Sequence, residues 1–219
     1  MKKFSLLDVA ALLIWLLPIG YLLWVYGSLP AIVPMHYGAD GKPNRYGSKS
    51  DFLVMQMIFP FISGGVYFLL KFLPSIDPKK QVKYGEQTFQ KLGFGLVIFM
   101  AAISISITFA TINQSFKIDK LLLPLIGLLF VFLGNVMHSI KPNYFAGVRT
   151  PWTLEDEGNW RATHRLTGKI WVIGGLIITI ATLVLPEGMG VFVFLPGILI
   201  ISFIPIIYSY IYFKKHQVK

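Results

Sequence analysis

Six long apolar segments alternate with polar loops along the chain. They cover residues 6–26, 52–72, 92–112, 121–140, about 166–185, and 189–213. A hydrocarbon core about 30 Å thick requires roughly 20 helical residues, and each segment reaches about that length. Because lipid offers the backbone no hydrogen-bonding partner, segments this long and apolar must form helices. The pattern therefore predicts an all-α integral membrane protein with six transmembrane helices.

Composition supports a membrane location. Of the 219 residues, 55% are hydrophobic and 14% are charged, which is too apolar a balance for one soluble core. Lys2 and Lys3 precede the first segment as in a signal peptide, but that segment has about 21 residues and no clear cleavage site, so we predict a retained helix. The absence of cysteine excludes disulfides, cysteine-ligated zinc and a thiol nucleophile.

The basic residues that give the net charge of +10 are distributed unevenly among the predicted loops. If both termini are cytoplasmic, 15 of the 20 basic residues lie inside, with Lys71 counted among them. The five outside are Lys42, Arg45, Lys49, Lys117 and Lys120. This asymmetry follows the positive-inside rule, so it predicts cytoplasmic N and C termini. It also explains the basic excess without direct binding of nucleic acid.

The predicted spans contain few ionisable groups. The exception is Asp8, near the start of the first predicted span. The scarcity of ionisable groups in the spans argues against a proton-coupled transporter. A passive pore or a lipid-handling protein remains an alternative function.

Gly127 and Gly134 lie seven residues apart and should permit close helix packing. The tight turn at 186–188 predicts that the last two helices form an antiparallel hairpin.

The first polar loop, residues 27–51, should face outside. Prolines at 30 and 34 and turn residues at 40–44 predict a short extended hairpin rather than a helix. His36 and Asp40 are four apart, a spacing that could hold a metal on a helix. The loop favours no helix and supplies no third ligand, so we expect an ordered outer cap without metal.

The second polar loop should face the cytoplasm. Thr153 resembles an N-cap followed by acidic residues, and we expect a helix from there directly into the fifth span. On it Glu157, Arg161 and Arg165 would share one face, and Trp160, His164 and Trp171 another. Two interpretations stay open: an interfacial helix contacting anionic lipid, and a docking surface for a cytoplasmic partner. Catalysis by His164 with a carboxylate would require a pocket, so we expect no enzyme and no cofactor.

Two motifs carry a family resemblance. The string IVPMHYGADGKPNRYGSKSDF resembles the outer loop of a bacterial membrane domain of unknown function, and NYFAGVRTPWTLEDEGNWRATHRLTGK resembles the central signature of the SdpI family. The resemblance implies a multi-pass protein of the bacterial cell membrane that confers immunity to a secreted, membrane-active peptide toxin. For the founding member it also implies capture of a cytoplasmic transcriptional repressor. It implies no catalytic residue. The competing functions are a membrane enzyme and a lipid-handling or transport protein of the cell envelope.

These readings assign candidate residues to both loops. For a toxin we expect the outer residues His36, Asp40, Lys42, Arg45 and Lys49. For a cytoplasmic partner we expect Asn143, Arg149, Trp152, Trp160, Arg161, His164 and Arg165. Within one membrane domain, residues 1–75 should form a helical pair with the outer loop 27–51. Residues 76–219 should form a four-helix region with the cytoplasmic loop 141–169.

Overall fold

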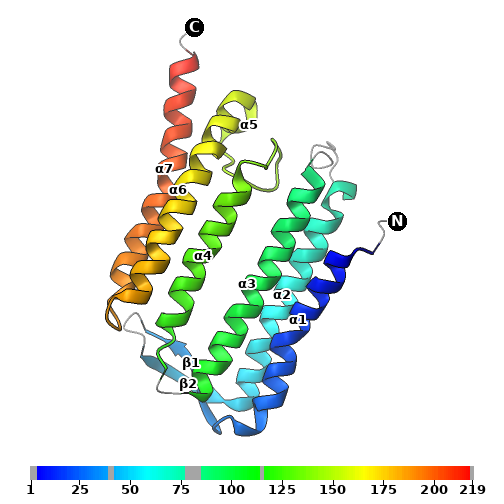
Figure 1. Ribbon diagram of the computed structural model, residues 1–219, viewed down its shortest axis with the longest axis vertical. Helices are drawn as coiled ribbons and strands as arrows, with labels where there is room; N and C mark the ends of the chain where they lie inside the picture. Colours follow the sequence, from blue (N-terminus) through cyan, green and yellow to red (C-terminus); the bar gives the residue numbers. More distant parts are fainter. Residues whose placement is uncertain (1–3, 39–41, 77–84, 114–115, 218–219) are drawn as a thin grey trace.

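The chain folds into long helices that run side by side, with a small β-hairpin at one end (Figure 1). The computed structural model describes residues 4–38, 42–76, 85–113 and 116–217. The long helices are α1 (Leu6–Val25), α2 (Lys49–Ile76), α3 (Glu86–Ile112), α4 (Asp119–Met137), α6 (Glu157–Val184) and α7 (Gly190–Gln217). The short elements are η1 (Tyr26–Ser28), β1 (Ile32–Tyr37), β2 (Pro43–Ser48) and α5 (Pro151–Glu155).

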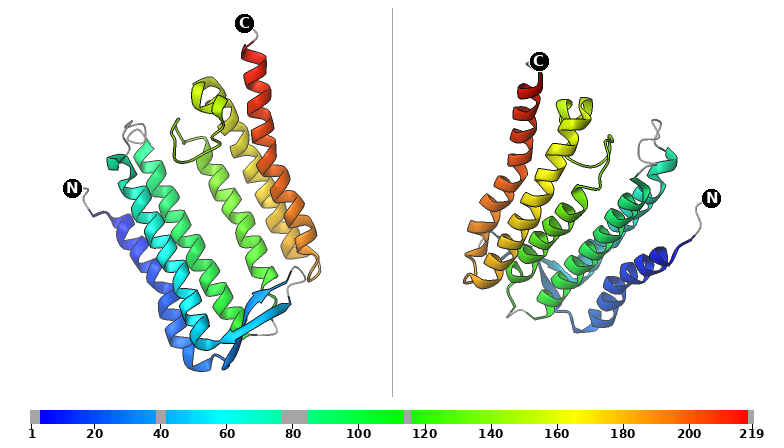
Figure 2. Two further views of the ribbon diagram at one scale, coloured as in Figure 1. Left: turned by 180° about the vertical axis from the view of Figure 1, so that it is seen from behind. Right: turned by 45° about the horizontal axis from the view of Figure 1, so that its top comes forward.

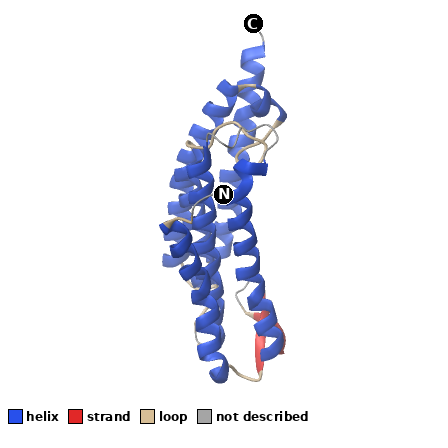
Figure 3. Cartoon of the chain, turned by 90° about the vertical axis from the view of Figure 1, so that its right-hand side faces the viewer, coloured by secondary structure: helices blue, strands red, loops and turns tan. Residues whose placement is uncertain are grey.

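Six of these helices are long and apolar enough to cross a membrane, which confirms the predicted fold class. Their outward surfaces carry large exposed apolar side chains such as Leu13, Phe61 and Val184, as lipid contact requires. Both termini lie at the end of the bundle opposite the hairpin (Figures 1 and 3). That they face the cytoplasm stays a prediction.

The helices form two groups of three. α3 packs mainly on α1 and α2, whereas α4 packs most extensively on α6, which in turn packs on α7 (Figures 1 and 2). The third long helix thus lies with the N-terminal pair, while the expected domain division at residues 75 and 76 stays a prediction. α6 and α7 form the expected antiparallel hairpin, and its turn contains Gly188 with φ of 75°.

Glycines bring α4 and α6 into backbone contact. A Cβ atom on Gly175 would lie 2.6 Å from the carbonyl oxygen of Gly127, and one on Gly168 would lie 2.9 Å from that of Gly134. Neither position has room for a side chain. The predicted role of Gly127 and Gly134 in close packing is therefore confirmed.

Polar side chains stabilise the helix irregularities. Pro205 cannot donate to the carbonyl of Ile201, and the Trp171 indole donates to that oxygen instead, at 2.9 Å. Lys120 donates to the carbonyls of Thr182 and Leu183 at 3.1 and 3.2 Å, which places a cation at the C-terminal end of α6. Side chains therefore replace the backbone partners that these helices lack.

The prediction of one continuous helix starting at Thr153 is wrong. Thr150 caps α5, because its hydroxyl accepts from the Thr153 N–H and Pro151 occupies the first helical position. Asp156 then adopts an extended conformation, and its carboxylate accepts from the Gly158 N–H at 2.7 Å to begin α6. Two caps in quick succession make the chain change direction between α5 and α6.

Candidate functional site

The segment from residue 139 to 165, called the cap below, connects α4 to α6 at the end of the bundle near the termini (Figure 1). Its first turn is organised by Asn143, which is 2% exposed. The Asn143 side-chain oxygen accepts from the N–H groups of Phe145 and Ala146 at 2.7 and 2.8 Å. Its amide nitrogen donates to the carbonyls of Lys141 and Ala146. Asn143 thus replaces the backbone partners that the turn lacks.

His164 joins this loop to α6. Its Nε2 accepts from the Val148 N–H at 3.2 Å, and its Nδ1 lies 2.8 Å from the Trp160 carbonyl. These partners assign a neutral ring with the proton on Nδ1. Gly147, with φ of 113°, lies so close that a Cβ atom there would overlap His164 Nε2. Both ring nitrogens are occupied, so His164 offers no site for proton transfer to a substrate.

Trp160 fills the centre of the cap. Its side chain is 1% exposed, stacks on the His164 ring at 4.0 Å between centroids, and donates to the Ile140 carbonyl at 2.8 Å. It packs in one hydrophobic cluster with Leu73, Phe89 and Met137. The predicted aromatic face of α6 therefore points into the protein.

A second set of contacts ties the cap to α7. The Trp152 indole donates to the Ser209 hydroxyl at 2.6 Å, and the Asn159 amide donates to the Ser209 carbonyl at 2.9 Å. Thr163 donates to the Asn159 side-chain oxygen at 2.9 Å. Asn159, Thr163 and Ser209 are fully buried, and their arrangement anchors α5 and α6 on α7.

The exposed part of the cap is basic. Arg149, Arg161 and Arg165 are exposed, and the Arg161 guanidinium lies 3.4 Å from the Glu157 carboxylate. Arg149 donates to the Tyr144 carbonyl. The expected partner-binding residues thus separate by location. Asn143, Trp160 and His164 are buried, Trp152 is half-buried, and the three arginines face outward.

The hairpin at the opposite end has the form expected from its turn residues. β1 pairs antiparallel with β2 from Ile32 opposite Ser48 to Tyr37 opposite Pro43, with irregular register around His36. Its base is anchored because Val33 packs with Phe52, both fully buried. Ser48 and Asp51 exchange hydrogen bonds that cap the start of α2. The hairpin is therefore fixed at its base.

The expected toxin-binding residues lie along this hairpin with different surroundings. His36 is exposed and its Nδ1 lies 2.6 Å from the Asn44 side-chain oxygen. Lys42 and Arg45 are exposed, whereas the Lys49 ammonium lies 5.0 Å above the Tyr26 ring. Asp40 lies outside the described residues. The structure thus brings His36 and Arg45 opposite one another in the hairpin, and the His36 ring contacts the Asn44 amide.

A cavity of about 170 Å³ opens between the hairpin and the connection from α3 to α4. Tyr37, Tyr46, Phe116 and Lys117 line it. Burial raises the pKa of the Tyr37 hydroxyl, although a hydrogen bond with the Thr111 side chain opposes the shift. Tyr37 is therefore a neutral polar group in an aromatic cavity. Sequence reasoning did not identify this cavity, because Phe116 and Lys117 belong to another loop.

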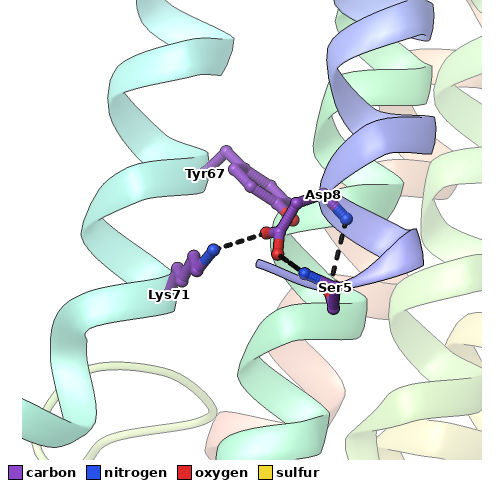
Figure 4. Close-up of polar contacts among 4 residues, drawn as sticks. All are labelled: Ser5, Asp8, Tyr67 and Lys71. Carbon is purple, nitrogen blue, oxygen red and sulfur yellow. Dashed lines mark hydrogen bonds and ion pairs between the residues drawn. The ribbon is translucent and has the colours of Figure 1, made fainter. Parts of the chain in front are cut away.

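A buried ionic cluster joins α1 and α2, as Figure 4 shows. The Asp8 carboxylate lies 2.7 Å from the Lys71 ammonium and accepts from the Tyr67 hydroxyl at 2.7 Å. It also accepts from the N–H and hydroxyl groups of Ser5. Counting Lys71 as a loop residue is therefore wrong, because it lies buried inside α2. Its position four residues after Tyr67, within the predicted span, was the available signal.

Comparisons with known proteins agree with both loop motifs. Residues 139–209 match the SdpI/YfhL protein family, and residues 13–59 match a domain of unknown function, DUF1648. "Immunity protein SdpI" of Bacillus subtilis (strain 168) is 25% identical over 87% of this chain and 88% of its own length. An "Uncharacterized protein" of Archaeoglobus fulgidus is 35% identical over 29% of this chain and 32% of its own length.

No solved structure matches the chain. With its six candidate spans, the chain is a multi-pass protein of the bacterial cell membrane that is homologous to an immunity protein. Residues 139–209 are similar to the SdpI/YfhL protein family, and the segment 13–59 on the N-terminal side is similar to DUF1648.

Proposed function

We propose that this protein confers immunity by protecting its cell from a secreted, membrane-active peptide toxin. The observation that carries the proposal is the similarity to "Immunity protein SdpI", which spans 87% of the chain. A similarity of this extent includes the hairpin, the cap and the spans between them. The proposed activity therefore belongs to the whole membrane domain and not to one motif.

The hairpin is the proposed toxin-binding end. Lys42 and Arg45 project from an anchored support, and the aromatic cavity lies beside the same strands. An amphipathic peptide could place apolar side chains against Tyr37 and Phe116 while its carboxylates meet the cations. Asp51 does not cancel this charge directly, because its carboxylate accepts from Ser48 at the start of α2. The hairpin thus combines the two chemistries that such a peptide requires.

The exposed arginines of the cap form the proposed cytoplasmic end. α6 runs without interruption from Glu157 to Val184, so one rigid helix connects the cap to the end near the hairpin. Toxin binding that shifts α6 would change how Arg149, Arg161 and Arg165 are presented to a cytoplasmic transcriptional repressor. Arginine suits this role because its planar guanidinium binds carboxylates through two hydrogen bonds.

We infer that the protein is not an enzyme. Its buried histidine, His164, has both nitrogens engaged by the backbone, and Asp8 is surrounded by donors from Ser5, Tyr67 and Lys71. Groups held in this way stabilise the fold and are not poised to exchange protons with a substrate.

The test is protection of a toxin-sensitive bacterial host that expresses the protein. Lys42→Gln with Arg45→Gln should reduce survival in the presence of a membrane-active peptide at unchanged membrane abundance. The matched control is Lys214→Gln with Lys215→Gln, which removes the same charge from exposed positions at the far end of α7. Lys49 is left intact because it is half-buried against Tyr26, unlike the exposed lysines.

Equal protection by both variants would remove the hairpin from the mechanism. Absence of protection by the parent protein against a broad set of such peptides would remove the immunity function itself. A reporter under the control of the captured repressor would measure the cytoplasmic step separately, since a protein can protect its host without signalling.

A further inference from the structure

A notch lies between α4 and α6 where the two helices meet at glycines. Gly134 and Gly168 let the two backbones touch here, since a Cβ atom on Gly134 would lie 2.8 Å from the Val172 nitrogen and 2.9 Å from the Gly168 carbonyl oxygen. Beside this crossing lies a cavity of about 390 Å³. Its walls are Asn135 and His138 from α4 and its end, and Arg165, Lys169, Val172 and Ile173 from α6.

The notch is positively charged and lacks an acidic side chain in its walls. Within the described part of the chain, Arg165, Lys169 and His138 form no ion pair. The neighbouring cavity of about 440 Å³ shares His138 and Arg165, and its acid, Glu157, is already paired with Arg161. The last carbonyls of α4 carry a partial negative charge equivalent to about half an elementary charge, less than Arg165 and Lys169 supply.

The exposed face of α6 changes chemistry at this level. Arg161, Arg165 and Lys169 follow one another at four-residue spacing, so they share one side of the helix. Ile173, Ile177 and Ile180 lie within roughly 80° of Lys169 around the helix, at about 100° per residue, and their side chains are all more than half exposed. At about 1.5 Å per residue, the aliphatic part below Lys169 extends roughly 16 Å. The cationic side chains of α6 are thus followed directly along the helix by exposed isoleucines.

We propose that this notch is a binding site for an anionic phospholipid. The phosphate binds between Arg165 and Lys169, with the Asn135 amide as a further donor, and an acyl chain lies along the isoleucines of α6. Arginine can bind two phosphate oxygens at once, and lysine adds a compact charge. Basic pockets between helices at the membrane boundary suit such head groups. The site goes beyond toxin immunity, because lipid binding requires no toxin, and it shares only Arg165 with the proposed docking surface.

The experiment uses the full-length protein reconstituted in vesicles of phosphatidylcholine containing a minority of phosphatidylglycerol. After gentle extraction, native mass spectrometry counts the phosphatidylglycerol molecules retained by each protein. Arg165→Gln with Lys169→Gln should lower retention about fivefold for each cation removed. Lys214→Gln with Lys215→Gln is the matched control, with the same charge change on the neighbouring helix α7, and it should retain the lipid like the parent.

Equal losses in the two variants would indicate diffuse surface attraction and would overturn the site, as would full retention in the Arg165 and Lys169 variant. Displacement of the lipid by free inorganic phosphate would show that the notch selects a soluble anion and not a phospholipid. Arg165→Lys with Lys169→Arg keeps both charges and should retain the lipid. This exchange variant keeps the test decisive if the glutamine variant fails to accumulate.

Discussion

The hairpin and the cap are both polar loops rich in motif residues, yet they use those residues in opposite ways. In the hairpin, β2 is almost wholly exposed, and so are Lys42 and Arg45. In the cap, Asn143, Thr153, Asn159, Thr163 and His164 are all buried and hydrogen-bonded. A dense polar motif therefore marks a surface in one case and an interior in the other.

The reason lies in the backbone that each loop must satisfy. A hairpin pairs its own N–H and C=O groups across two strands, so its backbone does not require side chains as hydrogen-bonding partners. The cap connects α4 to α6 without forming a ladder, and its buried backbone groups need side-chain partners. Much of the cap motif is thus a requirement of the fold, and its exposed arginines remain as the candidates for binding.

The largest expected effect concerns the sides of the membrane on which the two regions lie. The chain has no cysteine, so single cysteines can be introduced without background. Asn44→Cys should react with a membrane-impermeant maleimide in intact cells, whereas Glu155→Cys should react only after the membrane is opened. Reaction of both residues in intact cells would contradict the predicted topology and would place the cap outside.

The next effect tests the buried character of the cap. Trp160→Ala should lower the free energy of unfolding by about 3–5 kcal/mol, because it opens a cavity and removes the hydrogen bond to Ile140. Thermal unfolding in detergent and membrane abundance would both report the loss. The control is Trp24→Ala, since Trp24 is 82% exposed. If the two variants proved equally stable, the cap would not be the packed interior described above.

A smaller effect is expected at the tight loop of the cap. Gly147→Ala should lower the free energy of unfolding by roughly 1–3 kcal/mol, because alanine is strained at a φ of 113° and its methyl group displaces His164. Gly20→Ala in α1 is the matched control, as nothing lies near its added methyl group, and it should gain up to about 1 kcal/mol. Thermal unfolding measured side by side compares the two directly, and an unchanged Gly147 variant would show that the loop adapts.

Sequence patterns were sufficient to predict the elements whose hydrophobic or turn pattern extends over many residues. The apolar segments predicted all six long helices, and the prolines and turn residues of the first loop predicted the hairpin. Helix spacing also separated the charged face of α6 from its aromatic face. These features depend on local periodicity, which neighbouring residues alone determine.

What could not be predicted depends on contacts between distant residues. The sequence marked Trp160 and His164 as an aromatic pair, but only the packing of α6 on α4 decides that the pair is buried. Similarly, the sequence suggested that Lys71 is a loop lysine, whereas in the structure it pairs with Asp8 of α1. The break at Asp156 was missed because Thr150 and Thr153 are both plausible caps, and Pro151 favours the first.

The smallest effect on stability, and the sharpest on function, is expected from replacing Arg149, Arg161 and Arg165 together by lysine. All three are exposed and the net charge is unchanged, so the free energy of unfolding should change by less than about 0.5 kcal/mol for each substitution. Attraction to anionic lipid should also persist, because lysine supplies a similar charge. Lysine cannot form the paired hydrogen bonds of a guanidinium, so docking of an acidic partner surface should weaken.

The measurement combines a repressor-controlled reporter with a survival assay in the same cells. Normal survival with a silent reporter would assign the arginines to partner docking, and a normal reporter would leave them as membrane contacts and the hairpin as the binding end of the molecule.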